Sequence, residues 1–206
     1  MFTGIVTAIG TIASVEQRGD LRVTVACPYD PAAIAIGASI ACSGVCLTVV
    51  DRGGEPGSAW FAVDVSAETV SRTAHGLWRE GRRLNLEPSL NLGDELGGHI
   101  VSGHVDGVGT IADWRPEGDS TRLTIRAPAD LAPFIASKGS IAVDGVSLTV
   151  NGLADRADGS VDFGINLIPH TAEATTLGEM AQGAELNLEI DTIARYLQRL
   201  ESLRAR

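Results

Sequence analysis

The stretch SIACSGVCLTV at residues 39–49 returns as SIAVDGVSLTV at residues 140–150. Each copy is rich in β-branched and apolar residues and carries a glycine-containing turn, at residues 43–44 in the first and 144–145 in the second. This pattern predicts two short strands joined by a tight turn. Its recurrence predicts that one β-rich unit occurs twice in the chain.

The similarity extends along the chain in a constant order. Residues 4–13 match residues 103–112 at an offset of 99, and the run LNLE at residues 84–87 recurs at residues 186–189 at an offset of 102. Because the offset drifts so little, a tandem duplication explains the chain. Two units favour a pair of closed domains over a solenoid, whose core needs more repeats to cover it.

The sequence of each unit predicts short strands, tight turns and one short helix. The strand candidates of the first unit are residues 5–15, 21–27, 39–41, 45–51, 60–65 and 83–86. Asp30 followed by Pro31 predicts a helix start, and in the second unit Asp130 and Gly139 predict the start and end of the matching helix. Six strands per unit favour a small barrel without an exposed edge. The expected fold class is therefore all-β, a tandem duplication of a six-stranded antiparallel β-barrel with a C-terminal α-helix.

The duplication divides the chain into four parts. We expect an N-terminal barrel at residues 1–88, a linker at 89–98, a C-terminal barrel at 99–190 and a helix at 191–206. The linker, SLNLGDELGG in sequence from residue 89, contains turn-forming residues.

The C-terminal helix has no counterpart in the first unit. Asp191 or Thr192 can cap it, and its apolar residues follow helical spacing: Ile193, Tyr196, Leu197, Leu200 and Leu203. This stripe could form a lid on its own barrel or contact other subunits. We favour subunit contact, because two closed barrels do not need a further helix.

Composition restricts the class of protein. The 206 residues carry a formal net charge of −10 and show no basic patch with interleaved aromatic residues, so neither nucleic acid nor an anionic membrane is an expected partner.

The N-terminus lacks the features of a signal peptide, and no apolar run is long enough to span a membrane. The three cysteines, Cys27, Cys42 and Cys46, do not predict a disulfide framework or a zinc site. A cytoplasmic location is expected.

Four segments together resemble the riboflavin synthase family. They are MFTGIV at residues 1–6, SGVCLTV at 43–49, GGHIVSGHVDG at 97–107 and DGVSLTV at 144–150. The resemblance covers essentially the whole chain, including the duplication and the C-terminal helix.

The resemblance implies that each barrel binds one molecule of 6,7-dimethyl-8-ribityllumazine. It implies a homotrimer assembled through the C-terminal helices, with the N-terminal barrel of one subunit facing the C-terminal barrel of a neighbour. Two lumazines at that site would exchange a four-carbon unit and yield riboflavin and 5-amino-6-ribitylamino-uracil. No redox cofactor or metal is expected, because one substrate molecule donates what the other receives. Association with lumazine synthase is left open.

The resemblance points to Cys46, His104 and Ser147 as catalytic candidates. A cysteine in an apolar strand is most often a small buried apolar group, but the repeat matches Cys46 with Ser147, and both can donate a proton. The repeat matches His104 with Ile5, so the two units are chemically unequal there, and imidazole can transfer protons near neutral pH. A structural or supporting role is expected for His99.

The resemblance also places substrate-binding residues in matching segments. In the first unit they are Gly4, Ile5, Val6, Ser39, Cys46, Leu47, Thr48, Asp64, Val65, Ser66, Ala67, Glu68 and Thr69. In the second unit they are Gly103, His104, Val105, Lys138, Ser147, Leu148, Thr149, Ile168, Pro169, His170, Thr171, Ala172 and Glu173. We expect the glycine segments to lie close to the ring, the Cys46 and Ser147 segments to bind the pyrimidine edge, and the remaining loops to bind ribityl hydroxyls. For any one threonine, ordinary strand packing is the alternative.

Two other functions fit the same fold. One is a non-catalytic lumazine- or flavin-binding protein of the antenna type, and the other is a flavin module for electron transfer. Cys46 and His104 favour the enzyme over the antenna protein, since a carrier needs no proton relay. The absence of a GxGxxG fingerprint after a strand weakens the electron-transfer alternative.

Overall fold

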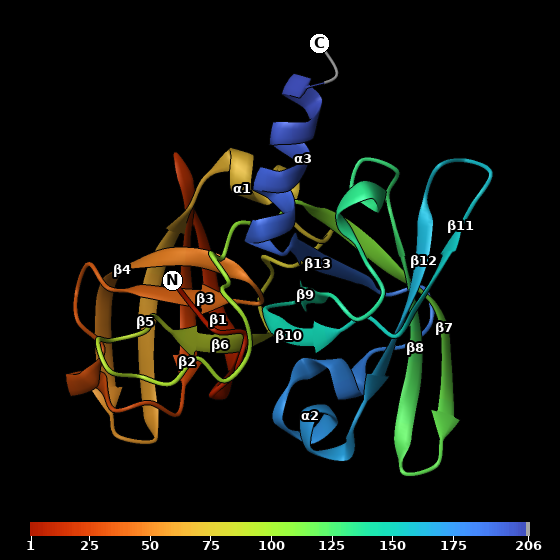
Figure 1. Cartoon of the computed structure of the whole chain (residues 1–206). Coiled ribbons are helices and arrows are strands. Elements are labelled where there is room, and N and C mark those ends of the chain that lie inside the picture. The colour runs from red at the N-terminus through yellow and green to blue at the C-terminus, as the bar shows by residue number, and fades with distance from the viewer. Residues whose placement is uncertain (205–206) are drawn as a thin grey trace.

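The structure, a computed structural model, describes residues 1–204, and its first repeat is a closed antiparallel barrel (Figure 1). The strands follow one another around it in the order β1-β2-β5-β4-β3-β6. Their bounds are β1 Ala8–Arg18, β2 Asp20–Cys27, β3 Ser39–Cys42, β4 Val45–Glu55, β5 Ser58–Val65 and β6 Arg83–Pro88. The six strands expected from the sequence are all present, although β1 begins three residues later than predicted, since residues 5–7 lie outside the barrel ladder.

The second repeat forms a sheet of seven strands in the order β10-β9-β13-β7-β8-β12-β11. The strands are β7 Gly107–Glu117, β8 Ser120–Ala127, β9 Ser140–Val143, β10 Val146–Thr149, β11 Gly152–Asp155, β12 Val161–Leu167 and β13 Glu185–Ile190. The extra strand arises because the segment equivalent to β4 is interrupted at Val150 and Asn151. The N–H of Val150 donates to Gly139 (3.0 Å), whereas that of Asn151 donates to Gly164 (2.8 Å) on the opposite side. The two ends of the sheet are therefore successive pieces of one segment, and the sheet curls back on itself.

The short helices test the predicted caps. The 3-10 helix η1 (Pro31–Ala33) begins as predicted, with Asp30 Oδ1 accepting from the N–H of Ala32 at 2.8 Å. In the second repeat η2 (Ala132–Phe134) follows Leu131, and no side chain caps it. The prediction of Asp130 as its cap was wrong, because the proline that suits the first helical turn stands three residues after Asp130 rather than next to it. Gly139 likewise lies beyond the end of this helix.

Each repeat encloses its own apolar core. Phe61, Leu84 and Leu86 are fully buried in the first core, and Phe163 and Leu188 take the matching places in the second. The two leucines of each LNLE run thus point into a barrel. The asparagine and glutamate of each run are polar and also buried, because they face the other repeat.

Two asparagines in these strands join the repeats. The side-chain N–H group of Asn85 donates to the carbonyl oxygen of Asp144 (2.9 Å), and that of Asn187 donates to the carbonyl oxygen of Ser43 (2.8 Å). Ser43 and Asp144 are the first residues of the two predicted turns, and both have φ +45°. The two turns therefore meet at an approximate two-fold axis between the barrels.

The helix α3 (Thr192–Arg204) projects away from both barrels (Figure 1). Asp191 Oδ1 accepts from the N–H of Ile193 at 2.8 Å, which is an N-cap contact. The predicted apolar stripe is exposed along its length, by 63% at Ile193, 66% at Tyr196 and 55% at Leu200. The alternative of a lid packed on its own barrel is therefore wrong for the described residues. No described helix has the length and apolar character needed to cross a membrane.

The contact between the two turns generates a stability prediction. A Cβ atom on Gly44 (φ +81°) would lie 2.8 Å from the amide nitrogen of Gly145, whereas one on Gly57 (φ +84°) would meet nothing within 4 Å. We expect Gly57→Ala to lower the free energy of unfolding by about 1–2 kcal/mol, the cost of a left-handed backbone. Gly44→Ala should cost about 1–3 kcal/mol more through overpacking. Urea unfolding measures both, and equal losses would contradict the close contact.

The buried carboxyl of Asp144 generates a second prediction. Burial raises its pKa from 3.8 to about 7, against the opposing effects of the hydrogen bond from the Asn187 N–H and the charge of Arg82. Between these values the folded protein holds a proton that the unfolded chain releases, so this group makes stability fall as pH rises from about 4 to about 7.

Asp144→Asn keeps the acceptor for Asn187 and tolerates the positive φ. We expect the variant to gain stability relative to the parent as pH rises over this range, by at most about 1.4 kcal/mol per pH unit. Chemical denaturation at a series of pH values measures the difference, with Asp20→Asn, an exposed change at the start of β2, as the control. Parallel pH profiles for Asp144→Asn and the parent would refute the assignment.

Candidate functional site

The segment that precedes the first strand of each repeat lies against the other repeat. Phe2 and Val101 pair through two backbone hydrogen bonds of 2.8 and 3.0 Å where the two segments pass one another. Beyond this crossing, Val6 packs on the core of the second barrel and Val105 on the core of the first. Each barrel is therefore completed by residues from the other repeat.

The crossing places Cys46 of β4 beside the second leading segment. The N–H of Cys46 donates to the carbonyl oxygen of Gly103 at 2.8 Å, and a Cβ on Gly103 would lie 2.6 Å from that of Cys46. Glycine is required there because the approach is close and φ is +78°. Cys46 is half-buried, while Cys27 and Cys42 are buried and burial raises the pKa of both thiols. Of the three cysteines, Cys46 is the one that reaches the surface between the repeats.

The equivalent place in the second barrel is built around Ser147 of β10. Its N–H donates to the carbonyl oxygen of Gly4 (2.8 Å), and Gly4 has φ +76°. Its hydroxyl also hydrogen-bonds Nδ1 of His99 at 2.7 Å. Burial lowers the pKa of His99, opposed by the charges of Asp191 and Glu189, and its buried Nε2 has no partner among residues 1–204. The supporting role expected for His99 is thus a direct contact with Ser147, and Cys46 has no matching histidine.

Two buried glutamates hold the crossing segments in place. Glu87 accepts from the N–H and hydroxyl of Thr3 (2.6 and 2.8 Å) and from the N–H of Gly4 (3.0 Å). Glu189 does the same for the other segment, accepting from Ser102, Gly103 and His104 at 2.6–3.0 Å. The sequence analysis named neither glutamate as a functional residue, although both belong to the repeated LNLE run that it identified.

His104 and Ile5 occupy matching positions in the two crossing segments. His104 directly follows the glycine that contacts Cys46, and its N–H donates to Glu189 at 3.0 Å. Ile5 directly follows the glycine that contacts Ser147, and both side chains are exposed. The sequence comparison paired His104 with Ile5 correctly, but it did not show that His104 lies near the first barrel within the same chain.

The other predicted strand residues divide by face. Thr48 and Thr149 are exposed on the same faces as Cys46 and Ser147, whereas the side chain of Leu47 belongs to the first core and Leu148 packs on the second. Ser39 pairs with Thr48 in the register of β3 and β4. Lys138 is exposed, and its backbone has φ +65°.

The two segments predicted to bind the ribityl chain extend into the first turns of the helices α1 (Ala67–Arg72) and α2 (Pro169–Ala174). In the first, Asp64 pairs with Arg22 (2.6 Å), and Ser66 caps α1 by accepting from the N–H of Thr69 at 3.1 Å. Glu68 pairs with Arg72 on the helix surface. Their polar groups thus have local partners before any ligand binds. Val65 is a buried core residue, whereas Ala67 is exposed.

The second loop differs, because Ile168 replaces the serine cap and offers no side-chain hydrogen bond to α2. Pro169, His170 and Glu173 are exposed, and Thr171 and Ala172 are half-buried. The two loops therefore present different chemistry at equivalent positions.

Metal binding finds no support in the described part of the chain. Within residues 1–204, no three His, Cys, Asp or Glu side chains are grouped so that they could hold an ion.

Comparison with known proteins identifies both repeats. The family model of the lumazine binding domain matches residues 3–89 and again residues 102–191. The chain is 50% identical over 204 residues to riboflavin synthase of Brucella abortus (strain 2308), an alignment that covers 97% of this chain and 98% of that protein. It is 46% identical to riboflavin synthase of Mycobacterium tuberculosis (strain ATCC 25618 / H37Rv), with 97% and 98% covered, and 37% identical to that of Bacillus subtilis (strain 168), with 97% and 89% covered.

Solved structures share the fold. LumP complexed with riboflavin superposes with a TM-score of 0.79 at 25% identity, covering 92% of this chain and 99% of that one. LumP complexed with 6,7-dimethyl-8-(1'-D-ribityl) lumazine gives a TM-score of 0.75 at 24% identity over the same shares. Two barrels joined as they are here are therefore an architecture found in proteins crystallised with lumazine and flavin.

Proposed function

Since the chain belongs to the riboflavin synthase family and carries two lumazine-binding domains in tandem, we propose that it converts two molecules of 6,7-dimethyl-8-ribityllumazine into riboflavin and 5-amino-6-ribitylamino-uracil. The reaction moves a four-carbon unit from one molecule to the other. The substrate is thus both donor and acceptor, so the protein must treat two identical molecules differently.

The observation that carries the proposal is the chemical inequality of two equivalent places. The first barrel combines Cys46 with the segment that bears His104, and the second combines Ser147 with His99 and the segment that bears Ile5. A pair of identical pockets would give both molecules the same environment. Here one molecule would meet a thiol and an exposed imidazole, and the other would meet a serine whose hydroxyl is already hydrogen-bonded.

The proposed chemistry needs proton transfer and orientation. The 7-methyl group of one lumazine must lose a proton, and C7 of the other must be attacked, so charge develops on both rings. We assign His104 and Cys46 to the polar contacts around these steps, with imidazole as the proton carrier. Glu189 is a positioning residue, because it fixes the backbone of residues 102–104. Holding two rings face to face could itself contribute on the order of 7–11 kcal/mol.

We further propose that the complete site forms between subunits of a homotrimer. The exposed apolar stripe of α3 supports self-association, because it lies on a helix that packs on neither barrel core. The first barrel of one subunit would then face the second barrel of a neighbour. A salt bridge of 2.6 Å between Asp106 and Arg195 holds the start of α3 against the second barrel. The orientation of the helix relative to this barrel would therefore determine how the subunits are arranged.

We also propose that the protein is cytoplasmic and that it completes its reaction without a partner enzyme. Three free cysteines fit a reducing compartment. Association with lumazine synthase stays a prediction that the proposed reaction does not need.

The main alternative is a carrier that binds lumazine or flavin without turnover. The likeness to LumP fits such a protein, but its 24–25% identity is well below the 37–50% identity to riboflavin synthases. Cys46 and His104 also favour the enzyme, since a carrier needs no proton transfer.

Turnover of the purified protein tests the function. We expect riboflavin fluorescence to appear from 6,7-dimethyl-8-ribityllumazine alone, without added cofactor. His104→Ala should lower kcat at least tenfold with a smaller change in substrate affinity, because general acid–base catalysis contributes on the order of 100-fold or more. Cys46→Ala should also lose activity, while Cys27→Ala, a matched change in the core of the first barrel, should keep it. Tight lumazine binding without turnover by the parent would establish the carrier instead.

Removal of α3 tests the assembly. A chain ending at Asp191 loses the apolar stripe but keeps both barrels, so it should change from trimer to monomer in light scattering and lose activity. As a milder variant, Leu197→Glu with Leu200→Glu puts charge into the stripe and should have the same effect, whereas Arg199→Glu on the same helix is the control. A trimer that survives these changes would rule out assembly through the helix.

A further inference from the structure

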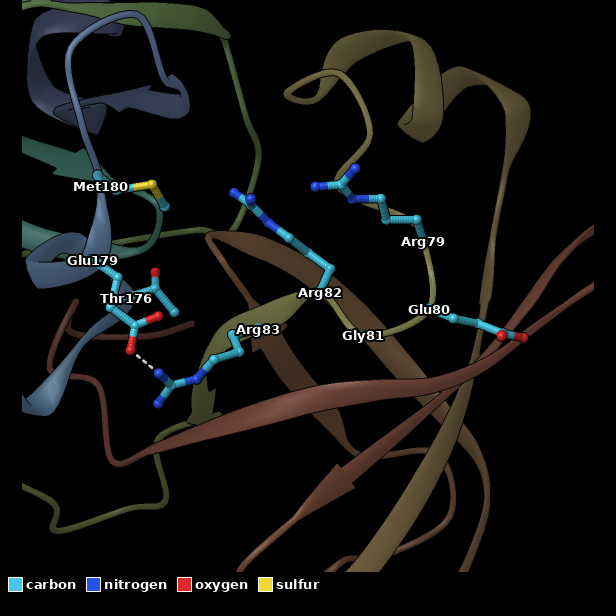
Figure 2. A pocket seen from close by; sticks show the side chains of 8 residues that line it. All are labelled: Arg79, Glu80, Gly81, Arg82, Arg83, Thr176, Glu179 and Met180. Carbon is cyan, nitrogen blue, oxygen red and sulfur yellow. Dashed lines mark ion pairs between the residues drawn. The ribbon is translucent and has the colours of Figure 1, made fainter.

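A cavity of about 410 Å³ lies at the junction of the repeats (Figure 2), and neither Cys46 nor Ser147 lines it. Its first wall is the turn before β6 together with the first residue of that strand, and it contributes Arg79, Arg82 and Arg83. Its second wall is η3 (Thr176–Glu179) with the following Met180. Three of the 16 basic residues of this acidic chain thus line a single cavity.

Two of the three guanidinium groups lack an acidic partner. Arg83 pairs with Glu179 across the cavity, but neither Arg79 nor Arg82 forms an ion pair with any residue in the range 1–204. The side chains of Arg79 and Arg82 extend in the same direction, toward the side of the cavity that carries Met180, whereas Glu80 points the opposite way (Figure 2). Two positive charges that line one cavity without an acidic partner favour the binding of an anion there.

Unsatisfied polar atoms mark the same place. Nε of Arg82 and Oγ1 of Thr176 are shielded from solvent and have no hydrogen-bond partner in the described chain, and Thr176 is only 3% exposed. Buried polar atoms usually have a hydrogen-bond partner, and the described residues do not supply one for these two atoms. The nearby Asp144 belongs to the contact between the two turns, where its Oδ1 already accepts from Asn187.

The duplication shows that the basic wall is not required by the fold. At the offset of 102, Arg79, Arg82 and Arg83 correspond to Ala181, Ala184 and Glu185. The cavity at the symmetry-related place therefore has an acidic wall, where Glu185 accepts from the N–H of His75 at 2.7 Å. Since the barrel forms with either set of side chains, the arginines need another explanation.

We propose that this cavity binds a small phosphate monoester, with Arg79 and Arg82 contacting the phosphate oxygens and Thr176 donating its hydroxyl hydrogen. Paired guanidinium groups match phosphate geometry better than any other side chain. The volume falls within the range of small-molecule pockets, so it accommodates an organic group as well as the phosphate. This site would be separate from the lumazine sites and does not depend on the proposed reaction.

Calorimetric titration of the full-length protein at constant ionic strength tests the proposal with glucose 6-phosphate, glucose and inorganic phosphate. We expect saturable binding of glucose 6-phosphate, weaker binding of inorganic phosphate and none of glucose. Arg79→Gln and Arg82→Gln should each weaken binding at least tenfold. Arg115→Gln, an exposed arginine of β7, should bind as the parent does. Glu179→Gln should tighten binding, because it releases Arg83.

Three results would overturn the proposal. They are no saturable binding of either phosphate compound, unchanged binding by both Arg79→Gln and Arg82→Gln, or tighter binding of inorganic phosphate than of the monoester. Arg79 is exposed, so its variant should fold normally, and thermal unfolding of each variant confirms that a loss of binding is not a loss of structure.

Discussion

The junction of the two repeats depends on a pair of buried asparagines, each of which hydrogen-bonds the opposite repeat. Besides donating to the facing turn, Asn85 accepts from the N–H of Thr176 (2.7 Å) and Asn187 accepts from the N–H of Ala74 (2.8 Å). Both asparagines are at most 2% exposed. Rotation of one repeat against the other would leave these groups buried without partners, at a cost of about 1–3 kcal/mol each. The junction therefore has one favoured geometry.

This fixed junction makes the crossing of the leading segments possible. Glu87 and Glu189 hold the two segments by their backbone N–H groups, and the segments can reach the opposite barrel only if the barrels stay in one relative position. Burial raises the pKa of Glu87, while the hydrogen bonds that it accepts from Thr3 and Gly4 act in the opposite direction. A single repeat would lack the segment that covers its Cys46 or Ser147 strand. The duplication is thus part of how each site is built.

The sequence predicted the strands and both turns because those features depend on local pattern. It did not predict the role of the polar residues in the LNLE runs at 84–87 and 186–189. Alternation with the leucines shows only that the asparagine and glutamate lie on the outer face of the strand, and it does not show that the other repeat covers this face. The crossing of the leading segments was missed for the same reason. The break between β10 and β11 was missed because it depends on hydrogen bonds to two other segments of the second repeat, at Gly139 and Gly164. The offset between the two copies shows which residues are equivalent, but it does not show which copy a segment packs against.

The same contacts explain why the copies could diverge where they did. Cys46 and Ser147 use their backbone N–H groups to hold the crossing glycines, so the fold constrains their main chain and leaves their side chains free to differ. His104 and Ile5 likewise follow glycines that the fold requires, and their own side chains are exposed. In the LNLE runs, by contrast, every side chain is buried in a core or in the junction, and the two copies are identical there. The barrels therefore differ at positions whose backbone is held by the junction and whose side chains the fold does not use. Substitutions there cost little stability, so two identical ligands could meet different side chains at these positions.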